Sequence, residues 1–254
     1  MNVTAHSDMG DRPYQEDAYL VPAASTDSPV VAVFDGMGGA AGGAVASDLA
    51  REELSASWEA SALPGLCDRL EAAAHAANAR VYERQRADRS LAGMGTTLVA
   101  AAWRVHAELG LLVAVVSVGD SRAYLVRGGK IHQVTRDHTV VAESVENGWI
   151  KPENAARHPR RHVLTRAVGT TARVPLDGFR FAVKPGDALV LCSDGLYGEL
   201  EDGAILGLVG DGADAKALVV AALRAAEERR EAAEAGDGER GEAADNCTAV
   251  VVRL

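Results

Sequence analysis

The sequence predicts an α+β fold from two patterns. Short apolar runs separated by turn residues fill the middle of the chain, over residues 95–135, which is typical of antiparallel strands. Longer segments with apolar residues at helical spacing lie on both sides of this middle part. A strand-rich middle with flanking helices indicates the α+β class, and an antiparallel sheet can bury one face against a second sheet.

The first part of the chain predicts strands, of which the most apolar ends in an acid. Residues 1–34 are expected to form a short strand, a polar motif and two further strands. Residues 30–34 are all apolar and mostly β-branched, which predicts a strand buried on both faces. Asp35 ends this run, and a glycine-rich turn follows. We expect the glycines to let the backbone approach a ligand closely, although an Asp-Gly pair alone is common in ordinary turns.

Two helices are expected next, over residues 44–58 and 66–81. The second is the clearer, because its apolar residues recur at helical spacing, namely Leu66, Leu70, Ala73, Ala77 and Val81. Its polar residues fall largely on the other side, namely Asn78, Arg80, Glu83 and Arg84. We expect this helix to pack on a sheet and to carry no chemistry.

The middle of the chain predicts a meander of strands, over residues 95–104, 109–118, 123–126 and 131–135. Residues 105–108 form the expected turn between the first two strands. Gly128 and Gly129 predict a two-residue hairpin turn between the last two.

The pattern changes over residues 139–162, which we interpret as an insert. Residues 140–146 predict a helix ended by Gly148, and Pro152 can occupy the first position of another helix. The insert is locally basic, with Lys151, Arg157, Arg160 and Arg161. Beyond it we expect strands over residues 179–183 and 188–193, helices over 205–209 and 215–235, a flexible loop over 236–244 and a last strand over 248–252.

The bulk properties narrow the class of protein. The chain has 254 residues, enough for one large core, and a formal net charge of −10, which argues against nucleic acid or an anionic membrane as a partner. Its three cysteines are widely spaced and predict reduced packing residues. No apolar stretch is long enough to span a membrane, and no signal peptide is evident, so we expect a cytoplasmic protein.

Four predicted strands have an acid at one end, namely Asp35, Asp120, Asp194 and Asp245. If these ends converge, several carboxylates share one site and cannot all stay ionised without cations. Oxygen ligands without His or Cys suit hard ions such as Mg²⁺ or Mn²⁺.

The order of the motifs resembles that of the metal-dependent protein phosphatases, the type 2C Ser/Thr phosphatases. The matching motifs are Gly10-Asp11-Arg12 with Glu16-Asp17, Asp35-Gly36-Met37-Gly38-Gly39, Gly93-Met94-Gly95-Thr96-Thr97, Val118-Gly119-Asp120-Ser121-Arg122-Ala123, Asp137-His138-Thr139, Leu164-Thr165-Arg166-Ala167, Ser193-Asp194-Gly195-Leu196 and Asp245-Asn246. They cover nearly the whole chain. The resemblance implies one catalytic domain over residues 1–254, folded as a four-layer α-β-β-α sandwich, in which residues 139–162 form a flap beside the active site.

The resemblance also implies the roles of the acids. Asp35 would bridge two Mn²⁺ or Mg²⁺ ions, and the Gly36 carbonyl would complete the coordination of one of them. Asp194 and Asp245 would bind the other ion, and Asp120 matches a third, weaker position found in bacterial members. A hydroxide shared by the two ions would attack the phosphorus directly, so no covalent phospho-enzyme is needed.

Arg12, Glu16 and Asp17 carry the remaining implied roles. Arg12 would hold the substrate phosphate, because a guanidinium pairs two phosphate oxygens at once. Glu16 and Asp17 would support metal-bound water from the outer shell. A surface arginine in a loose ion pair is the alternative for Arg12, and a solvated structural insert is the alternative for the flap.

The sequence departs from the family where a proton donor is expected. Ala40 stands where bacterial relatives often have a histidine, and Met37 where eukaryotic members have one. His6, His138 and His158 are substitute donors to consider, although each is also explained by a structural role.

The implied substrates are phosphorylated proteins that are targets of a Ser/Thr kinase, and the enzyme is expected to act as a monomer. Two alternatives stay open from the sequence. One is a phosphatase for small phosphate monoesters, and the other is a catalytically weak sensor module on the same fold.

Overall fold

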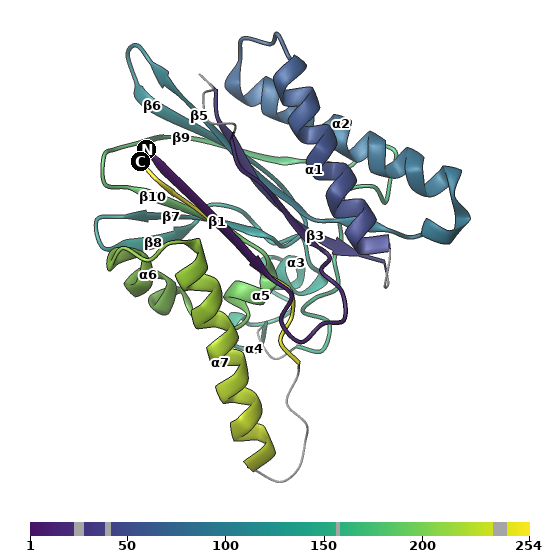
Figure 1. Ribbon diagram of the computed structural model, residues 1–254, viewed down its shortest axis with the longest axis vertical. Helices are drawn as coiled ribbons and strands as arrows, with labels where there is room; N and C mark the ends of the chain where they lie inside the picture. Colours follow the sequence, from purple (N-terminus) through teal and green to yellow (C-terminus); the bar gives the residue numbers. More distant parts are fainter. Residues whose placement is uncertain (23–27, 39–41, 156–157, 236–242) are drawn as a thin grey trace.

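Two antiparallel sheets lie face to face, with helices on the outer face of each (Figure 1). The computed structural model describes residues 1–22, 28–38, 42–155, 158–235 and 243–254. The first sheet has the strand order β1 (Asn2–Asp8), β11 (Cys247–Arg253), β10 (Ala188–Cys192), β7 (Arg122–Arg127) and β8 (Lys130–Gln133). The second has the order β2 (Asp17–Leu20), β3 (Val30–Met37), β5 (Leu98–His106), β6 (Gly110–Val118) and β9 (Asp177–Val183), with β4 (Gly95–Thr96) paired to β3.

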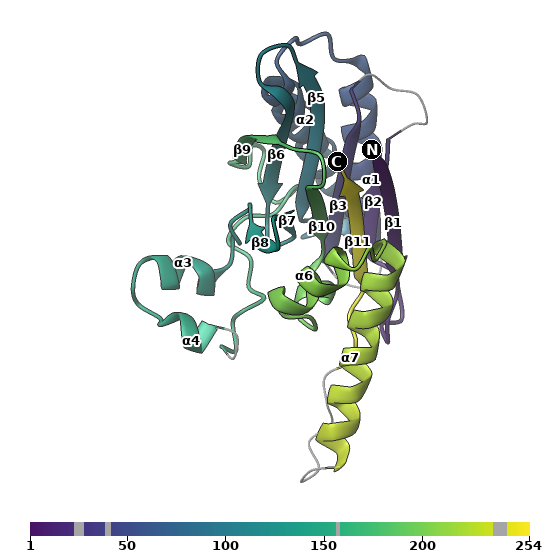
Figure 2. The ribbon, with the colours of Figure 1, turned by 90° about the vertical axis from the view of Figure 1, so that its left-hand side faces the viewer.

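The helices complete the four layers. The second sheet is covered by α1 (Gly42–Ala60) and α2 (Leu66–Ala87), and a short 3₁₀ helix, η1 (Arg89–Leu91), follows α2. The first sheet is covered by α5 (Asp194–Tyr197), α6 (Asp202–Gly210) and α7 (Ala215–Ala235). Figure 2 shows α3 (Val140–Glu146) and α4 (Pro152–Ala155) standing off one end of the sheets. The predicted α-β-β-α sandwich is confirmed.

Strand β3 shows why its sequence is apolar without alternation. Val31 and Val33 lie in the core between the sheets, whereas Ala32 and Phe34 pack in the core under α1 and α2. Both faces of the strand are therefore buried, and each buried apolar side chain favours the fold by about 1–3 kcal/mol. This rigid strand carries Asp35 near its end.

The predicted meander is divided between the two sheets. Strands β5 and β6 pair in one sheet, whereas β7 and β8 pair in the other, so the chain crosses between the sheets at Gly119 and Asp120. The turn between β5 and β6 also lies later than expected, because β5 continues to His106, which pairs with Gly110. The hairpin at Gly128 and Gly129 is confirmed, and both glycines have the positive φ that this turn requires.

Asn78 corrects the expected polar face of α2. Its side chain is fully buried, and its hydrogen bonds are satisfied. It donates to the carbonyls of Thr171 and Ala172 and accepts from the backbone N–H of Gly169. Asn78 thus anchors the segment that precedes β9. Periodicity alone placed it wrongly, since a polar residue can be buried when its hydrogen bonds are satisfied.

The other predicted elements are found close to their expected bounds, including α3, α4, α6 and α7. Residues 164–166 contribute only an isolated bridge between Leu164 and Thr139. The expected loop over residues 236–244 lies largely outside the described residues. In the described part of the chain, no helix is both long and apolar enough to cross a membrane.

Candidate metal and phosphate site

The predicted acids meet at one end of the two sheets. Asp35 lies near the end of β3 and is directly paired with Asp17 of β2. Asp120 follows β6, Asp194 begins α5 after β10, and Asp245 precedes β11. All four of these neighbours are close enough to raise the pKa of Asp35. Convergence of the strand ends, which the sequence analysis required, is therefore confirmed.

The carboxylates of this cluster are buried and repel one another, and nearby cationic side chains do not offset this cost. Burial raises the pKa of Asp17 to about 8, with a smaller contribution from Asp194 and Asp245. Burial and Asp194 likewise raise the pKa of Asp120 to about 8. Burial and the neighbouring acids raise the pKa of Asp35 well above its ordinary value. Such a cluster favours bound cations, because each cation offsets the repulsion between carboxylates.

Two carboxylate oxygens at the site lack a hydrogen-bond partner. Among the described residues these are Oε1 of Glu16 and Oδ1 of Asp17, both buried from solvent. Burial also raises the pKa of Glu16. A buried acceptor is normally satisfied, so these oxygens fit a site that takes a hydrated cation.

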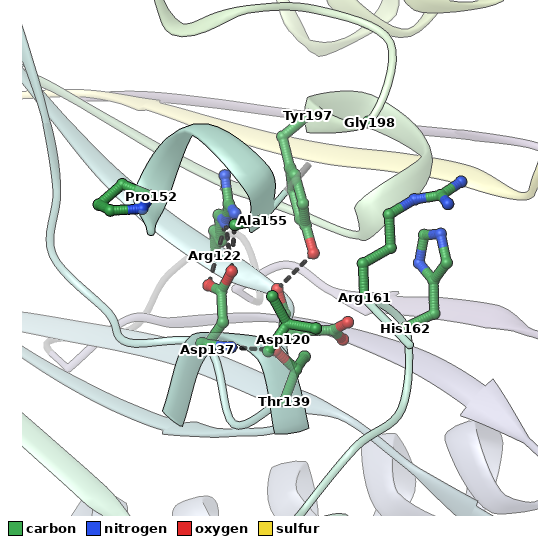
Figure 3. Close-up of a pocket in the computed structure, with 12 residues that line it drawn as sticks. Asp120, Arg122, Asp137, Thr139, Pro152, Ala155, Arg161, His162, Tyr197 and Gly198 are labelled. Carbon is green, nitrogen blue, oxygen red and sulfur yellow. Dashed lines mark hydrogen bonds and ion pairs between the residues drawn. The ribbon is translucent and has the colours of Figure 1, made fainter. Parts of the chain in front are cut away.

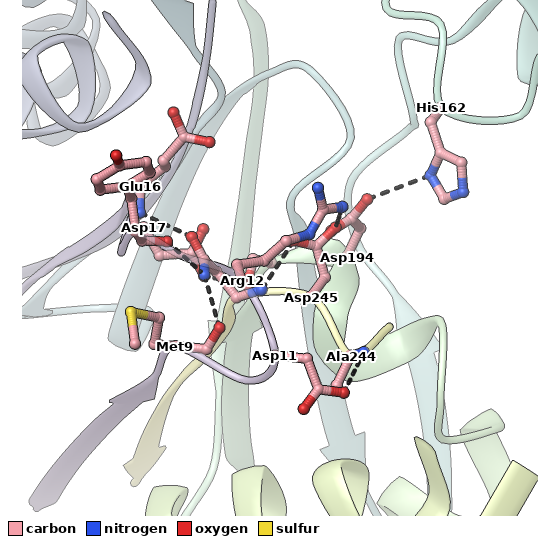
Figure 4. Close-up of polar contacts among 12 residues, drawn as sticks. Met9, Asp11, Arg12, Glu16, Asp17, His162, Asp194, Ala244 and Asp245 are labelled. Carbon is pink, nitrogen blue, oxygen red and sulfur yellow. Dashed lines mark hydrogen bonds and ion pairs between the residues drawn. The ribbon is translucent and has the colours of Figure 1, made fainter. Parts of the chain in front are cut away.

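Two of the acids pair with an arginine and a histidine in this structure (Figure 4). Arg12 Nη2 lies 2.7 Å from Asp245 Oδ2, and His162 Nδ1 lies 3.3 Å from Asp194 Oδ2. The hydrogen bond with Asp194 raises the pKa of His162. In the part of the chain that the structure describes, no three His, Cys, Asp or Glu side chains already form a closed metal cage. The donor set fits a hard divalent ion, and Asp194 and Asp245 here pair with His162 and Arg12.

Gly36 is required for close packing of backbone. A Cβ on Gly36 would overlap the carbonyl oxygens of Gly43 and Glu16. The N–H of Gly36 also donates to the Glu16 carbonyl, at 3.1 Å. From the sequence, we expect this glycine to let the backbone approach a ligand. The contacts that the structure shows for it are instead with backbone at the start of α1 and in the loop before β2.

Asn246 fixes the loop that carries Arg12. Its amide nitrogen donates to the carbonyls of Met9 and Tyr14, at 2.9 and 3.0 Å, and its amide oxygen accepts from the N–H of Glu16 at 2.7 Å. Arg12 lies between these anchor points, and 53% of its side chain is exposed. The guanidinium is therefore positioned by the loop and still accessible to a ligand.

Residues of the segment 139–162 and of the core line a cavity of about 390 Å³ beside the acids (Figure 3). Asp120 and His162 line it, as does Tyr197, whose hydroxyl donates to the Asp120 carbonyl at 3.0 Å. Arg122 also lines the cavity. It pairs with Asp137 at 2.6 Å and stacks over the Tyr197 ring. The segment of residues 139–162 thus lies beside the acid cluster.

Sequence reasoning missed His162, the last residue of the predicted insert. The structure gives His138 a structural role, since its Nδ1 accepts from the N–H of Gly119 and the side chain is buried. His158 Nδ1 accepts from the N–H of Arg160, also a local contact. His6 lies within β1, opposite Ala249.

The contact between His162 and Asp194 is seen only in the three-dimensional structure, because the two residues are far apart in sequence. Ala40 lies outside the described residues.

Comparison with known proteins agrees with this geometry. The family model for Protein phosphatase 2C matches residues 6–235. The Ser/Thr phosphatase stp of Listeria monocytogenes is 36% identical over 189 residues, which cover 73% of each chain.

Solved structures extend the likeness to the fold. The crystal structure of the Mycobacterium tuberculosis Ser/Thr phosphatase PstP matches with a TM-score of 0.82 and 34% identity, covering 100% of this chain and 98% of that one. The PstP catalytic domain in complex with two manganese ions matches with a TM-score of 0.75 and 32% identity, covering 98% and 96%. The chain therefore belongs to the protein phosphatase 2C family of metal-dependent Ser/Thr phosphatases.

Proposed function

We propose that Asp35 bridges two Mn²⁺ or Mg²⁺ ions, with the Gly36 carbonyl completing the coordination of one and Asp194 and Asp245 binding the other. The observation that carries this assignment is the convergence of these carboxylates at one end of the sheets, where burial first and the neighbouring acids second raise the pKa of Asp35 well above its ordinary value. The similarity to a PstP structure with two manganese ions supports the number and type of ion.

Asp120, Glu16 and Asp17 have secondary roles in this proposal. Asp120 takes part in a third and weaker ion site, supported by its burial and its raised pKa. Glu16 and Asp17 hold water around the ions, supported by the unpaired oxygen on each side chain. When bound, the ions supply positive charge at the phosphoryl oxygens and lower the pKa of the attacking water.

Arg12 binds and orients the substrate phosphate. Its guanidinium is exposed, and among the described residues its Nη2 pairs with Asp245, so further N–H donors remain for phosphate oxygens. A metal ion held by Asp245 would leave the Arg12 guanidinium available to the phosphate. Arg12 then neutralises charge that develops on the phosphoryl group in the transition state.

The proposed substrates are phosphoserine and phosphothreonine in proteins modified by a Ser/Thr kinase. The enzyme is proposed to act as a cytoplasmic monomer of one domain, residues 1–254, in which residues 139–162 form the flap. The support comes from relatives that are Ser/Thr phosphatases and from the position of α3 and α4 beside the acid cluster.

Phosphate release tests this function and separates the alternatives. We expect Mn²⁺-dependent release from phosphothreonine and phosphoserine peptides, with a higher kcat/KM than for small phosphate monoesters of metabolites. A preference for the small esters would favour the small-molecule alternative. Binding of Mn²⁺ by titration calorimetry without turnover of either class would favour the sensor module.

A further inference from the structure

The loop that carries Arg12 is tied at its tip to helix α7. Asp11 Oδ2 lies 2.6 Å from Arg230 Nη1 of α7, and the same oxygen accepts from the N–H of Ala244 at 3.1 Å. The N–H of Asp11 in turn donates to the carbonyl of Ala244 at 3.0 Å. One acid thus joins α7, the Arg12 loop and the segment that leads into Asp245. Figure 4 shows the contact between Asp11 and Ala244.

The loop and this segment are in direct backbone contact. Gly10 has a φ of +60°, and a Cβ at this position would overlap the carbonyl oxygens of Asp245 and Ala244. The Gly10 N–H donates to Asp8 Oδ1 at 2.9 Å, and this hydrogen bond closes the turn. We therefore expect a shift of Asp11 to displace Arg12 relative to its partner Asp245.

Among the described residues, side chains leave an open groove between the loop and α7. A cavity of about 220 Å³ lies there, lined by Gly10 and Asp11 on one side and by Leu223, Glu227 and Arg230 on the other. Asp11 and Arg230, which form the ion pair, both line this cavity. The loop tip is therefore held by hydrogen bonds to Ala244 and, on the side of α7, by this charged contact.

We infer that Arg230 is a positioning residue, which sets the affinity of the site for phosphate by holding the Arg12 loop through Asp11. This inference rests on the proposed role of Arg12 in phosphate binding. Arg230 is not a catalytic residue, since it acts through Asp11 and the loop. The outer half of α7, which extends beyond the sheets in Figure 1, would then be mechanically linked to the phosphate site.

The neighbouring residue offers a matched control. Arg229 Nη2 pairs with Glu199 Oε1 at 2.7 Å, on the same helix and with the same charge. Loss of Arg229 removes one positive charge from α7 but leaves the Asp11 contact intact. Arg229→Met therefore separates a long-range effect of charge from the effect of the specific ion pair.

The test measures competitive inhibition by inorganic phosphate in the Mn²⁺-loaded enzyme. We expect Arg230→Met to raise the inhibition constant of phosphate and the KM for a phosphothreonine peptide about three- to fivefold, the scale of one exposed ion pair. The kcat should change less than about twofold. Arg230→Lys should restore most of the affinity, and Asp11→Asn should behave like Arg230→Met. Thermal melting confirms that each variant is folded.

A double-mutant cycle with Arg12→Ala identifies the route of the effect. If Arg230 acts through Arg12, then Arg230→Met changes nothing further in the Arg12→Ala background. An effect that persists in that background, or one equal to that of Arg229→Met, overturns the inference. If Arg12→Ala itself leaves inhibition by phosphate unchanged, the proposed role of Arg12 is wrong, and the inference that depends on it falls as well.

Discussion

Arg12 is held by its ion pair with Asp245 and by the loop that carries it. We predict that Arg12→Ala raises the KM for phosphopeptides and lowers kcat, because the variant loses its phosphate-binding guanidinium. The affinity for Mn²⁺ should stay near normal, since the acids are unchanged. Steady-state kinetics and Mn²⁺ titration measure the two effects separately. Normal kinetics combined with lost Mn²⁺ binding would reverse the assignment.

Asn246 is the residue whose loss should most disturb this loop. Asn246→Ala leaves the carbonyls of Met9 and Tyr14 and the N–H of Glu16 without their partner. We expect the free energy of unfolding to fall by about 2–3 kcal/mol, since Asn246 is buried and its partners lose their hydrogen bonds.

Urea denaturation measures the change in Asn246→Ala. Asn147→Ala is the control, because Asn147 makes a single exposed side-chain contact to the Glu143 carbonyl at the end of α3. Equal stability of the two variants would show that Asn246 does not anchor the loop.

At the level of single residues, the sequence predicted the acids but not their surroundings. Asp35, Asp120, Asp194 and Asp245 were recognisable because each lies at the end of an apolar run. The contacts of Arg230 and His162 carry no local pattern, since each depends on how a helix or the flap is placed against the sheets.

At the level of elements, periodicity predicted helices well and sheet membership poorly. Strands β6 and β7 follow one another closely, yet they lie in different sheets. The crossing at Gly119 and Asp120 leaves no mark in the hydrophobic pattern, because both strands are buried on both faces. Asn78 shows the same limit in a helix, where satisfied hydrogen bonds allowed a polar side chain to be buried.

The turn between β9 and β10 provides a test of pH dependence. Burial alone would raise the pKa of Asp187, but hydrogen bonds from Arg127 and from the N–H of Lys184 hold this pKa below its ordinary value. A depressed pKa in the folded state stabilises the protein above the unfolded pKa, near 4, and the contribution is lost as the pH falls through the folded value.

We therefore predict that Asp187→Asn lowers the free energy of unfolding by about 1–2 kcal/mol at pH 7. The difference from wild type should shrink once the pH falls below about 4. Urea titrations at several pH values measure it, with Asp48→Asn as the control for an exposed ion pair on α1. A difference that stays constant down to pH 3 would contradict the account, since the Asp187 carboxyl would then have the same pKa in the folded and unfolded states.

At the level of the whole molecule, the acid cluster lies where the two sheets meet, so metal binding should stabilise the entire fold. A ligand present at a free concentration of 100 times its Kd raises the free energy of unfolding by about 2.7 kcal/mol. For a chain of this size we expect Mn²⁺ to raise the Tm of EDTA-treated protein by roughly 5–10 °C. Differential scanning calorimetry with and without Mn²⁺ measures this shift. A Tm that ignores Mn²⁺ at concentrations that support activity would show that the ions are not bound between the sheets.

The most direct test of the account is phosphate release from a phosphothreonine peptide by EDTA-treated wild type and Asp35→Asn, measured as Mn²⁺ is added back. The account predicts that wild type is inactive until Mn²⁺ is restored. It also predicts that Asp35→Asn keeps less than about a tenth of the wild-type kcat, a loss of at least roughly 1.4 kcal/mol of transition-state stabilisation, because the charge between two cations is gone. Full activity of the metal-free wild type, or near-normal kcat in Asp35→Asn, would contradict it.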